Sequence, residues 1–232
     1  MLHLNQVEFT QGSFSLVANF TIQTGAKVAV IGPSGEGKST LLHGIAGFLK
    51  PTRGNIRWAG EPMPSHPGLR PISLLFQDHN LFPHLTVFNN VAIGLNPRLK
   101  LSAPQKEQVS LALQKVGLQD RNESYPSDLS GGQRGRIGLA RVLLRKRPLL
   151  LLDEPFAALG PALKDEMLEV LDNVLSSNSA TALMVTHDPQ DALIFADQAI
   201  LVADGYASAP QPIQEFFDDP PRALKAYLGN RT

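Results

Sequence analysis

The chain has 232 residues, which is enough for one large domain, or for two lobes of one, with a substantial core. Lysine plus arginine and aspartate plus glutamate number 21 each, and this zero formal charge argues against a dedicated nucleic-acid binder, whose domain is usually clearly basic. The lack of cysteine excludes a disulfide framework, a thiolate nucleophile and a Cys-ligated metal. No apolar run approaches the ~20 residues needed to cross a bilayer, so work at a membrane would require a partner that holds the chain there.

The first thirty residues have the pattern of antiparallel strands. Apolar residues alternate with mostly polar neighbours at the period of two that is typical of a half-buried strand, at Phe14, Leu16, Ala18, Phe20 and Ile22. Further strands are predicted at residues 55–58 and 72–76.

A glycine-rich loop follows the apolar run 28–31 and precedes a helix-like segment at 41–49. Strand, glycine loop and helix in this order form a cradle whose backbone N–H groups wrap nucleotide phosphates. We expect the Lys38 ammonium to bind the β- and γ-phosphates and the Ser39 hydroxyl to bind Mg²⁺. The loop fits G-x-x-x-x-G-K-[ST], and its candidate nucleotide-binding residues are Gly32, Pro33, Ser34, Gly35, Glu36, Gly37, Lys38, Ser39 and Thr40. The sequence therefore predicts that the protein binds a nucleoside triphosphate.

The second half of the chain has the pattern of an α/β core with a helical insertion. From about 87 to 118 the pattern is helical, and Ser102 to Gln105 predict a capping box with Pro104 at the first helical position. Short apolar runs separated by helices then indicate a parallel sheet, with Pro161 and Pro189 at the expected starts of two helices. These runs lie at 149–152, 182–185 and 199–203.

Two further motifs identify a family by resemblance. The loop Leu129-Ser130-Gly131-Gly132-Gln133 begins twenty residues before the run of four leucines that leads into Asp153-Glu154-Pro155. The loop resembles the signature motif, and the leucine run the Walker B strand, of ATP-binding cassette (ABC) ATPases, and the resemblance covers essentially the whole chain. Asp153, at the end of a buried strand, is well placed to hold the Mg²⁺ shell directly or through water. Glu154 can polarise the attacking water as a general base.

The resemblance implies roles for three more residues. Gln77 matches the glutamine that touches Mg²⁺ or the attacking water, with a plain surface residue as the alternative. His187 matches the switch histidine that contacts the γ-phosphate. Phe9, upstream of Gly32, is the candidate for the aromatic that stacks on adenine, although Phe14 is close and a core role for Phe9 is the alternative.

By the same resemblance, the fold is a P-loop ABC ATPase core with an N-terminal antiparallel β subdomain and an inserted α-helical subdomain at approximately 82–140. The whole chain, 1–232, is expected to be a single domain without an extra C-terminal regulatory domain. In this family the signature loop, here Ser130, Gly131, Gly132 and Gln133, binds the γ-phosphate held by the opposite subunit, where a helix N-terminus favours an anion. We therefore expect a homodimer that encloses ATP head to tail.

Two positions depart from the family pattern. The loop after the Walker B strand usually carries an aspartate where this chain has Gly160, which brings the tightness of coupling into question but not nucleotide binding. Gly135 stands early in the helix after the signature loop, where glutamine is common, at a cost of about 1 kcal/mol in helix propensity.

The signature loop argues against a P-loop kinase or GTPase. A DNA-repair or translation ABC ATPase would usually carry a coiled-coil insertion or a second cassette, and an exporter commonly has fused membrane helices; the sequence shows none of these. Segments 46–51, 70–87 and 94–101 resemble the ATP-binding subunits of bacterial thiamine importers, and 70–87 lies where this family docks a membrane subunit. The implied partners are a second ATPase subunit, two membrane permease subunits and a periplasmic thiamine-binding protein, at the cytoplasmic face of the inner membrane, with no nucleic acid. An importer of another solute, such as a polyamine or ferric ion, is the alternative.

Overall fold

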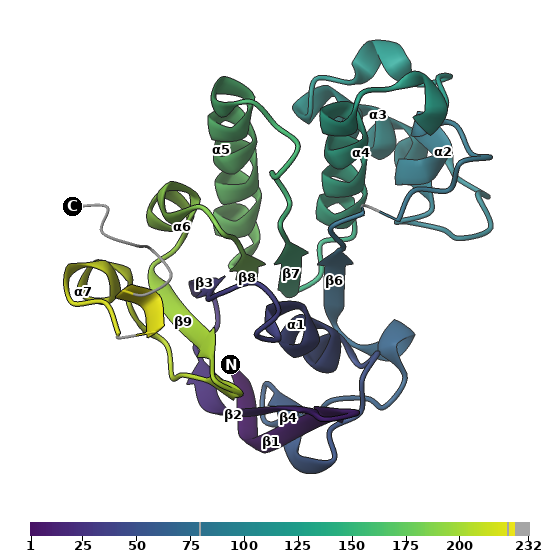
Figure 1. Ribbon diagram of the computed structural model, residues 1–232. Coiled ribbons are helices and arrows are strands. Elements are labelled where there is room, and N and C mark those ends of the chain that lie inside the picture. The colour runs from purple at the N-terminus through teal and green to yellow at the C-terminus, as the bar shows by residue number, and fades with distance from the viewer. Residues whose placement is uncertain (79, 222, 226–232) are drawn as a thin grey trace.

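The fold is built on one continuous mixed sheet that has a parallel half and an antiparallel half (Figure 1). The computed structural model describes residues 1–78, 80–221 and 223–225. The strand order is β5-β4-β1-β2-β10-β9-β3-β8-β7-β6, with β11 beside β9. The strands are β1 (Leu2–Gln11), β2 (Phe14–Ile22), β3 (Lys27–Ile31), β4 (Arg53–Trp58), β5 (Glu61–Pro62), β6 (Ile72–Leu75), β7 (Leu149–Asp153), β8 (Thr181–Val185), β9 (Gln198–Ala203), β10 (Tyr206–Ala207) and β11 (Gln211–Pro212).

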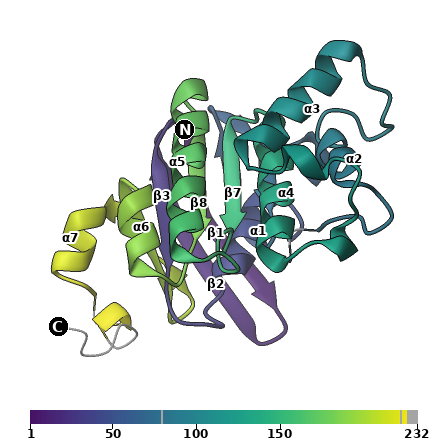
Figure 2. The same cartoon turned by 90° about the horizontal axis from the view of Figure 1, so that it is seen from above.

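Helices cover both faces of the parallel half. They are α1 (Lys38–Ala46), α2 (Val87–Ala92), α3 (Ala103–Lys115), α4 (Gly131–Leu144), α5 (Pro161–Asn178), α6 (Pro189–Phe195) and α7 (Ile213–Asp218). Figure 1 shows α1 between the strands β1, β2 and β4 and the parallel strands, and Figure 2 shows α2 and α3 grouped beside α4, away from α6 and α7. Within the described ranges, no helix has the combination of length and apolar character that a bilayer span requires.

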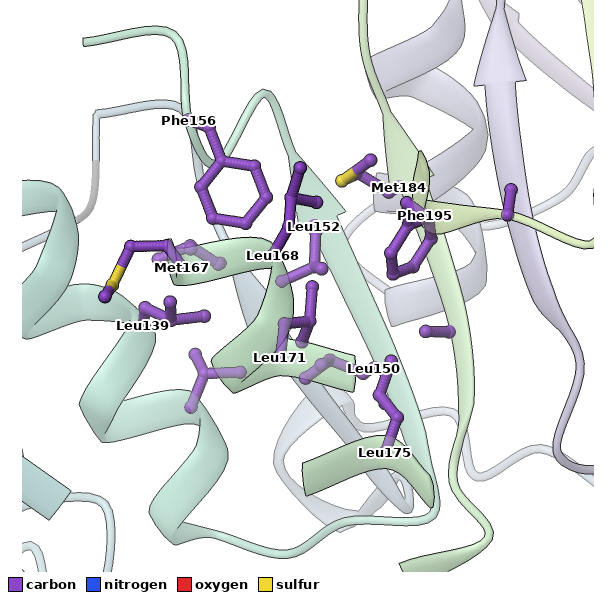
Figure 3. Close-up of a cluster of buried hydrophobic side chains, with 14 of the residues drawn as sticks. Leu139, Leu150, Leu152, Phe156, Met167, Leu168, Leu171, Leu175, Met184 and Phe195 are labelled. Atoms are coloured by element: carbon purple, nitrogen blue, oxygen red, sulfur yellow. The ribbon is translucent and has the colours of Figure 1, made fainter. Parts of the chain in front are cut away.

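The strands β9, β3, β8, β7 and β6 are mutually parallel, so their carboxyl ends meet at one edge of the sheet. All residues of β7 are buried, as expected for a strand covered on both faces. Leu149 and Leu151 face the α1 side, whereas Leu150 and Leu152 join the cluster under α5. Figure 3 shows the latter pair packed against the leucines of α5, which fixes α5 to the sheet.

The helices α2, α3 and α4 form the helical group, and each begins at a side-chain cap, at Thr86, Ser102 and Ser130 respectively. The predicted capping box is present: the Ser102 amide donates to Oε1 of Gln105 at 2.9 Å, and the Gln105 amide donates to Oγ of Ser102 at 3.4 Å. The helix begins at Ala103, however, so Pro104 occupies its second position and not the first.

The chain does not become helical directly after the Asp204–Gly205 turn. β10 instead pairs with β2 in parallel and with β9 in antiparallel orientation, and α7 begins only at Ile213. The two residues of β10 join the two halves of the sheet. They pair with backbone groups that β2 and β9 would otherwise leave unpaired. Residues 222 and 226–232 lie outside the described residues.

Candidate functional site

The phosphate loop joins β3 to α1, and its lysine is folded into it. The helix begins at Lys38, earlier than predicted, because Gly37 takes a left-handed conformation (φ 98°) from which the chain enters the helix. The ammonium donates hydrogen bonds to the carbonyl oxygens of Gly32 (2.8 Å) and Pro33 (2.7 Å). Burial lowers the pKa of Lys38, although three nearby carboxylates act to raise it. Because an ammonium has three donors, these two bonds are compatible with a third to a phosphate.

The loop is also tied to the end of β9. A Cβ atom on Gly32 would overlap the carbonyl oxygen of Val202, so this close approach requires glycine. The carboxylate of Glu36 accepts a hydrogen bond of 2.8 Å from the amide of Asp204. The C-terminal end of β9 therefore contacts the phosphate loop at two points, Gly32 and Glu36.

The structure contradicts the adenine-stacking role of Phe9. Phe9 is fully buried, and its ring lies so close to α1 that a Cβ atom on Gly44 would overlap it. The ring thus packs α1 onto the antiparallel strands and cannot reach a base, which is the core role left open as the alternative. Phe14 lies at the phosphate loop instead, with its Cζ atom 2.5 Å from the position of a Cβ on Gly37.

A cleft of about 610 Å³ opens beside the loop, at the carboxyl edge of the sheet. Its lining residues are Ser39, His43, Phe76, Gln77, Asp78 and Asp153. The Ser39 hydroxyl hydrogen-bonds the Asp153 carboxylate, whose pKa is raised mainly by burial. A hydroxyl, an amide and a carboxylate are oxygen ligands of the kind that Mg²⁺ prefers, so the three predicted metal residues fit this cation.

The strands β7 and β8 are neighbours, and the residues that follow them meet. Nδ1 of His187 lies 3.3 Å from Oε2 of Glu154, with side-chain exposures of 59% and 22%. Glu154 has a positive φ (47°), a conformation that costs a non-glycine residue about 1–3 kcal/mol and that is concentrated at functional sites. Its amide donates to the carbonyl oxygen of Val185 at 3.1 Å, which holds the turn against β8.

The signature loop caps α4. The Gln133 amide donates to Oγ of Ser130 (3.3 Å), and the Ser130 amide donates to Oε1 of Gln133 (2.9 Å). Gly131 and Gly132 open the helix, and a Cβ on Gly132 would lie 2.9 Å from Cδ2 of Leu159 in the loop after β7. The described residues that line the nucleotide cleft include none from the signature loop.

A second cleft, of about 250 Å³, lies between β6 and the helical group. Its lining residues are Leu74, Phe76, Asn80, Phe82, Ile93, Gly94, Arg141, Val142 and Arg145. Phe76 lines both clefts. The buried Asn90 shapes the rim: its amide nitrogen donates to the carbonyl oxygens of Phe82 and Leu85 at 3.0 Å. This cleft is lined by part of the predicted docking segment 70–87, of which residue 79 lies outside the described residues.

The two departures from the family pattern differ in their surroundings. Gly160 precedes α5 with φ −73°, and the described residues place no other heavy atom within 4 Å of a Cβ there. An aspartate would therefore fit without strain. Gly135 is buried within α4.

One cluster was not found from the sequence. The ammonium of Lys164, in the first turn of α5, lies 2.8 Å from Oδ2 of Asp188 and 2.9 Å from Oδ1 of Asp191. Asp188 directly follows His187, so this cluster adjoins the Glu154–His187 pair. The partners are 24 and 27 residues apart in the chain, and no local motif joins them; the nearest sequence signal was the predicted helix starts at Pro161 and Pro189.

Comparison with known proteins gives a consistent set of relatives. Residues 17–157 match a family model described as ABC transporter. The chain is 57% identical over 230 residues to the thiamine import ATP-binding protein ThiQ of Cereibacter sphaeroides, which covers 99% of this chain and 100% of that protein. It is 51% identical to the protein of the same name from Ruegeria sp., over the same shares of both chains.

Solved structures agree with these relatives. A dimeric, post-hydrolysis structure of the ATP-binding cassette MJ0796 bound to ADP and Pi superposes with a TM-score of 0.82 at 28% identity, covering 92% of this chain and 99% of that one. A second dimeric structure of MJ0796, described as a bacterial ABC transporter cassette, gives a TM-score of 0.81.

Proposed function

Because this chain belongs to the ABC transporter family as an ATP-binding, ATP-hydrolysing cassette, we propose that it powers uptake of thiamine or thiamine phosphates through a membrane permease. The observation that carries the proposal is that the nucleotide cleft and the Glu154–His187 pair lie at the same edge of the sheet. The cleft that joins Ser39, Gln77 and Asp153 lies at the same edge as the Glu154–His187 pair. The solute is proposed from the relatives, which are named for thiamine import.

The nucleotide is held by the phosphate loop, residues 32–40, with Lys38 on the β- and γ-phosphates. Ser39, Gln77 and Asp153 hold Mg²⁺, which when bound neutralises charge on the phosphate oxygens. Phe14 replaces Phe9 as the aromatic for the adenine, because it is the one of the two that lies against the phosphate loop.

Hydrolysis uses the groups that follow β7 and β8. Glu154 accepts the proton of the attacking water, since its carboxylate is partly exposed and next to the metal-binding Asp153. His187 contacts the γ-phosphate through its exposed ring and, through Nδ1, keeps the Glu154 carboxylate oriented.

Two copies of the chain complete the sites. The capped N-terminus of α4, with Ser130, Gly131, Gly132 and Gln133, binds the γ-phosphate of the partner's nucleotide, because helix N-termini favour anions. The separation of this loop from the cleft of its own chain, and the dimeric structures of MJ0796, support this arrangement.

The membrane subunits dock at the second cleft, between β6 and the helical group, on the cytoplasmic face of the inner membrane. Residues 1–232 act as one cassette in which the helical subdomain, approximately 82–140, carries one wall of that cleft. Closure of the ATP-bound dimer then moves the docked permease subunits between access states, and a periplasmic thiamine-binding protein delivers the solute.

Uptake into vesicles tests the proposal. Purified ATPase, permease and binding protein are reconstituted, and ATP-driven uptake of thiamine, its phosphates, a polyamine and ferric ion is compared, with Lys38→Ala as the matched inactive control. Uptake of thiamine or its phosphates alone is the expected result. Uptake of the polyamine or ferric ion instead would assign the other importer class, and ATP hydrolysis without uptake of any solute would contradict the transport role.

A further inference from the structure

Lys164 lies where two functional loops come together. It is in the first turn of α5, directly after the loop 157–160, and it reaches across to the start of α6. Its side chain is 19% exposed, and that of Asp191 is 9% exposed. Burial alone would lower the pKa of Lys164, but the hydrogen bonds to both carboxylates outweigh it and raise the pKa, so the ammonium stays charged.

The carboxylates that hold Lys164 belong to the loop that carries His187. Asp188 accepts a hydrogen bond of 3.0 Å from the Gln190 amide and thereby caps α6. The Thr186 hydroxyl accepts from the Asp188 amide (3.1 Å) and approaches Oδ2 of Asp191 at 3.5 Å. His187 is thus flanked on both sides by residues of one hydrogen-bonded network, while its own ring remains exposed.

The network and the hydrolysis pair line the same small cavity. This cavity, of about 60 Å³, is lined by Glu154, His187, Lys164 and Asp191 among others. A displacement of the Lys164 ammonium would therefore change the packing around the Glu154–His187 contact.

The helix that carries Lys164 gives the network a fixed base. Met167, Leu168, Leu171 and Leu175 are buried in the cluster that Figure 3 shows against Leu150 and Leu152. Loop 157–160, by contrast, ends at Gly160, which has no side chain with which to cap α5.

We propose that Lys164 is a positioning residue for ATP hydrolysis: by joining Asp188 and Asp191 to α5, it sets the place of His187 against Glu154 and links the loop 157–160 to that pair. The inference rests on the proposed roles of Glu154 and His187. Because Lys164 does not itself reach the nucleotide cleft lining, its loss affects kcat and leaves nucleotide binding intact.

The test compares Lys164→Met, Lys164→Arg and Lys27→Met in the reconstituted transporter. Lys27 is the matched control, because it makes a 2.8 Å ion pair with Asp172 farther along the same helix and has a similar exposure of 24%. We expect Lys164→Met to lower kcat for ATP roughly tenfold to a hundredfold with KM within about twofold. Lys164→Arg should restore most of kcat, and Lys27→Met should match the unchanged protein.

Loss of Lys164 also leaves the buried Asp191 without its cation, which destabilises the fold. The double variant Lys164→Met/Asp191→Asn removes that charge, so its unfolding temperature should return toward that of the unchanged protein while kcat stays low. Recovery of kcat together with stability would show a purely structural role and overturn the inference, as would unchanged kcat in Lys164→Met. Glu154→Gln is run alongside: if it hydrolyses ATP normally, the proposed site fails, whichever result Lys164 gives.

Discussion

The carboxylate of Glu154 lies 3.3 Å from Nδ1 of His187, although the two residues are 33 positions apart in the chain. They meet because β7 and β8 are parallel neighbours that end at the same edge of the sheet. The positive φ of Glu154 turns the chain at this point, so a residue that would otherwise continue the strand presents its side chain to the histidine.

Glu154→Gln should bind ATP and hydrolyse it at least about 100-fold more slowly, because the amide keeps the shape of the carboxylate but cannot accept the proton of water. The ATP-bound variant should accumulate as a closed dimer. Phosphate release and size-exclusion chromatography with ATP measure the two effects, and Glu169→Gln, on the exposed side of α5, is the matched control. Unchanged hydrolysis in Glu154→Gln would exclude Glu154 as the base.

Lys38→Ala should weaken ATP binding by about tenfold to a hundredfold, since hydrogen bonds to charged groups contribute about 1.5–3 kcal/mol each. The variant also loses the two bonds to the carbonyl oxygens of Gly32 and Pro33, so a modest loss of stability is expected. Titration with a fluorescent ATP analogue and thermal unfolding separate the two. Normal ATP affinity would refute the phosphate cradle.

Asp153→Asn should stabilise the metal-free protein at neutral pH. Burial raises the pKa of Asp153, so the folded state favours the protonated carboxyl. Ionisation of such a carboxyl lowers the stability of the folded state. This loss of stability is absent below the unfolded-state pKa, grows between the unfolded-state and folded-state pKa values, and is constant above the folded-state pKa. The advantage of the variant should therefore vanish below about pH 4 and grow as the pH rises above that value.

Added Mg²⁺ with a non-hydrolysable ATP analogue should reverse this order, because the cation then stabilises the ionised carboxylate of the unchanged protein. Thermal unfolding across pH, with and without both ligands, measures the effect. A variant that is less stable than the unchanged protein at neutral pH without ligands would contradict the explanation.

Phe9→Ala and Phe14→Ala should separate core packing from nucleotide binding. Removing the buried ring of Phe9 should cost about 3–5 kcal/mol of unfolding free energy, as large-to-small core changes do. Phe14 is only partly buried, so Phe14→Ala should be milder in stability and should lower ATP affinity. Denaturant unfolding and ATP titration decide between them. Weakened binding in a stable Phe9→Ala protein would reinstate Phe9 as the adenine residue.

Gly160→Asp should keep or increase permease-stimulated ATP turnover. The side chain has room, and an aspartate at the N-cap of α5 should add only about a few tenths of a kcal/mol of stability, because glycine is itself a tolerated N-cap residue. Gly160→Ala is the matched control, since it adds a Cβ without a carboxylate. A marked slowing in the aspartate variant alone would mean that glycine is an adapted feature of this cassette.

The sequence predicted those parts of the molecule that depend on short-range patterns. The phosphate loop, the capping box at Ser102 and the parallel strands all arise from local spacing of residue types, which a single sequence records directly. The place of Phe9 was not predictable in this way, because strand alternation does not reveal which face a distant helix will cover. In the structure α1 covers it, and Gly44 provides the space for its ring.

The pairing of Lys164 with Asp188 and Asp191 was missed for a related reason. An ion pair between two helices depends on how both pack on the sheet, and neither helix alone carries a signal for it. β10 was missed because two residues are too few for a periodic pattern, and its pairing depends on two strands that are distant in the sequence.

Phe76 lines both the nucleotide cleft and the second cleft. A change of the Phe76 rotamer would reshape both cavities, and this one residue would then link ATP binding to permease docking. Thermodynamic reciprocity then sets a strict condition: whatever factor a docked permease adds to ATP affinity, ATP must add to permease affinity.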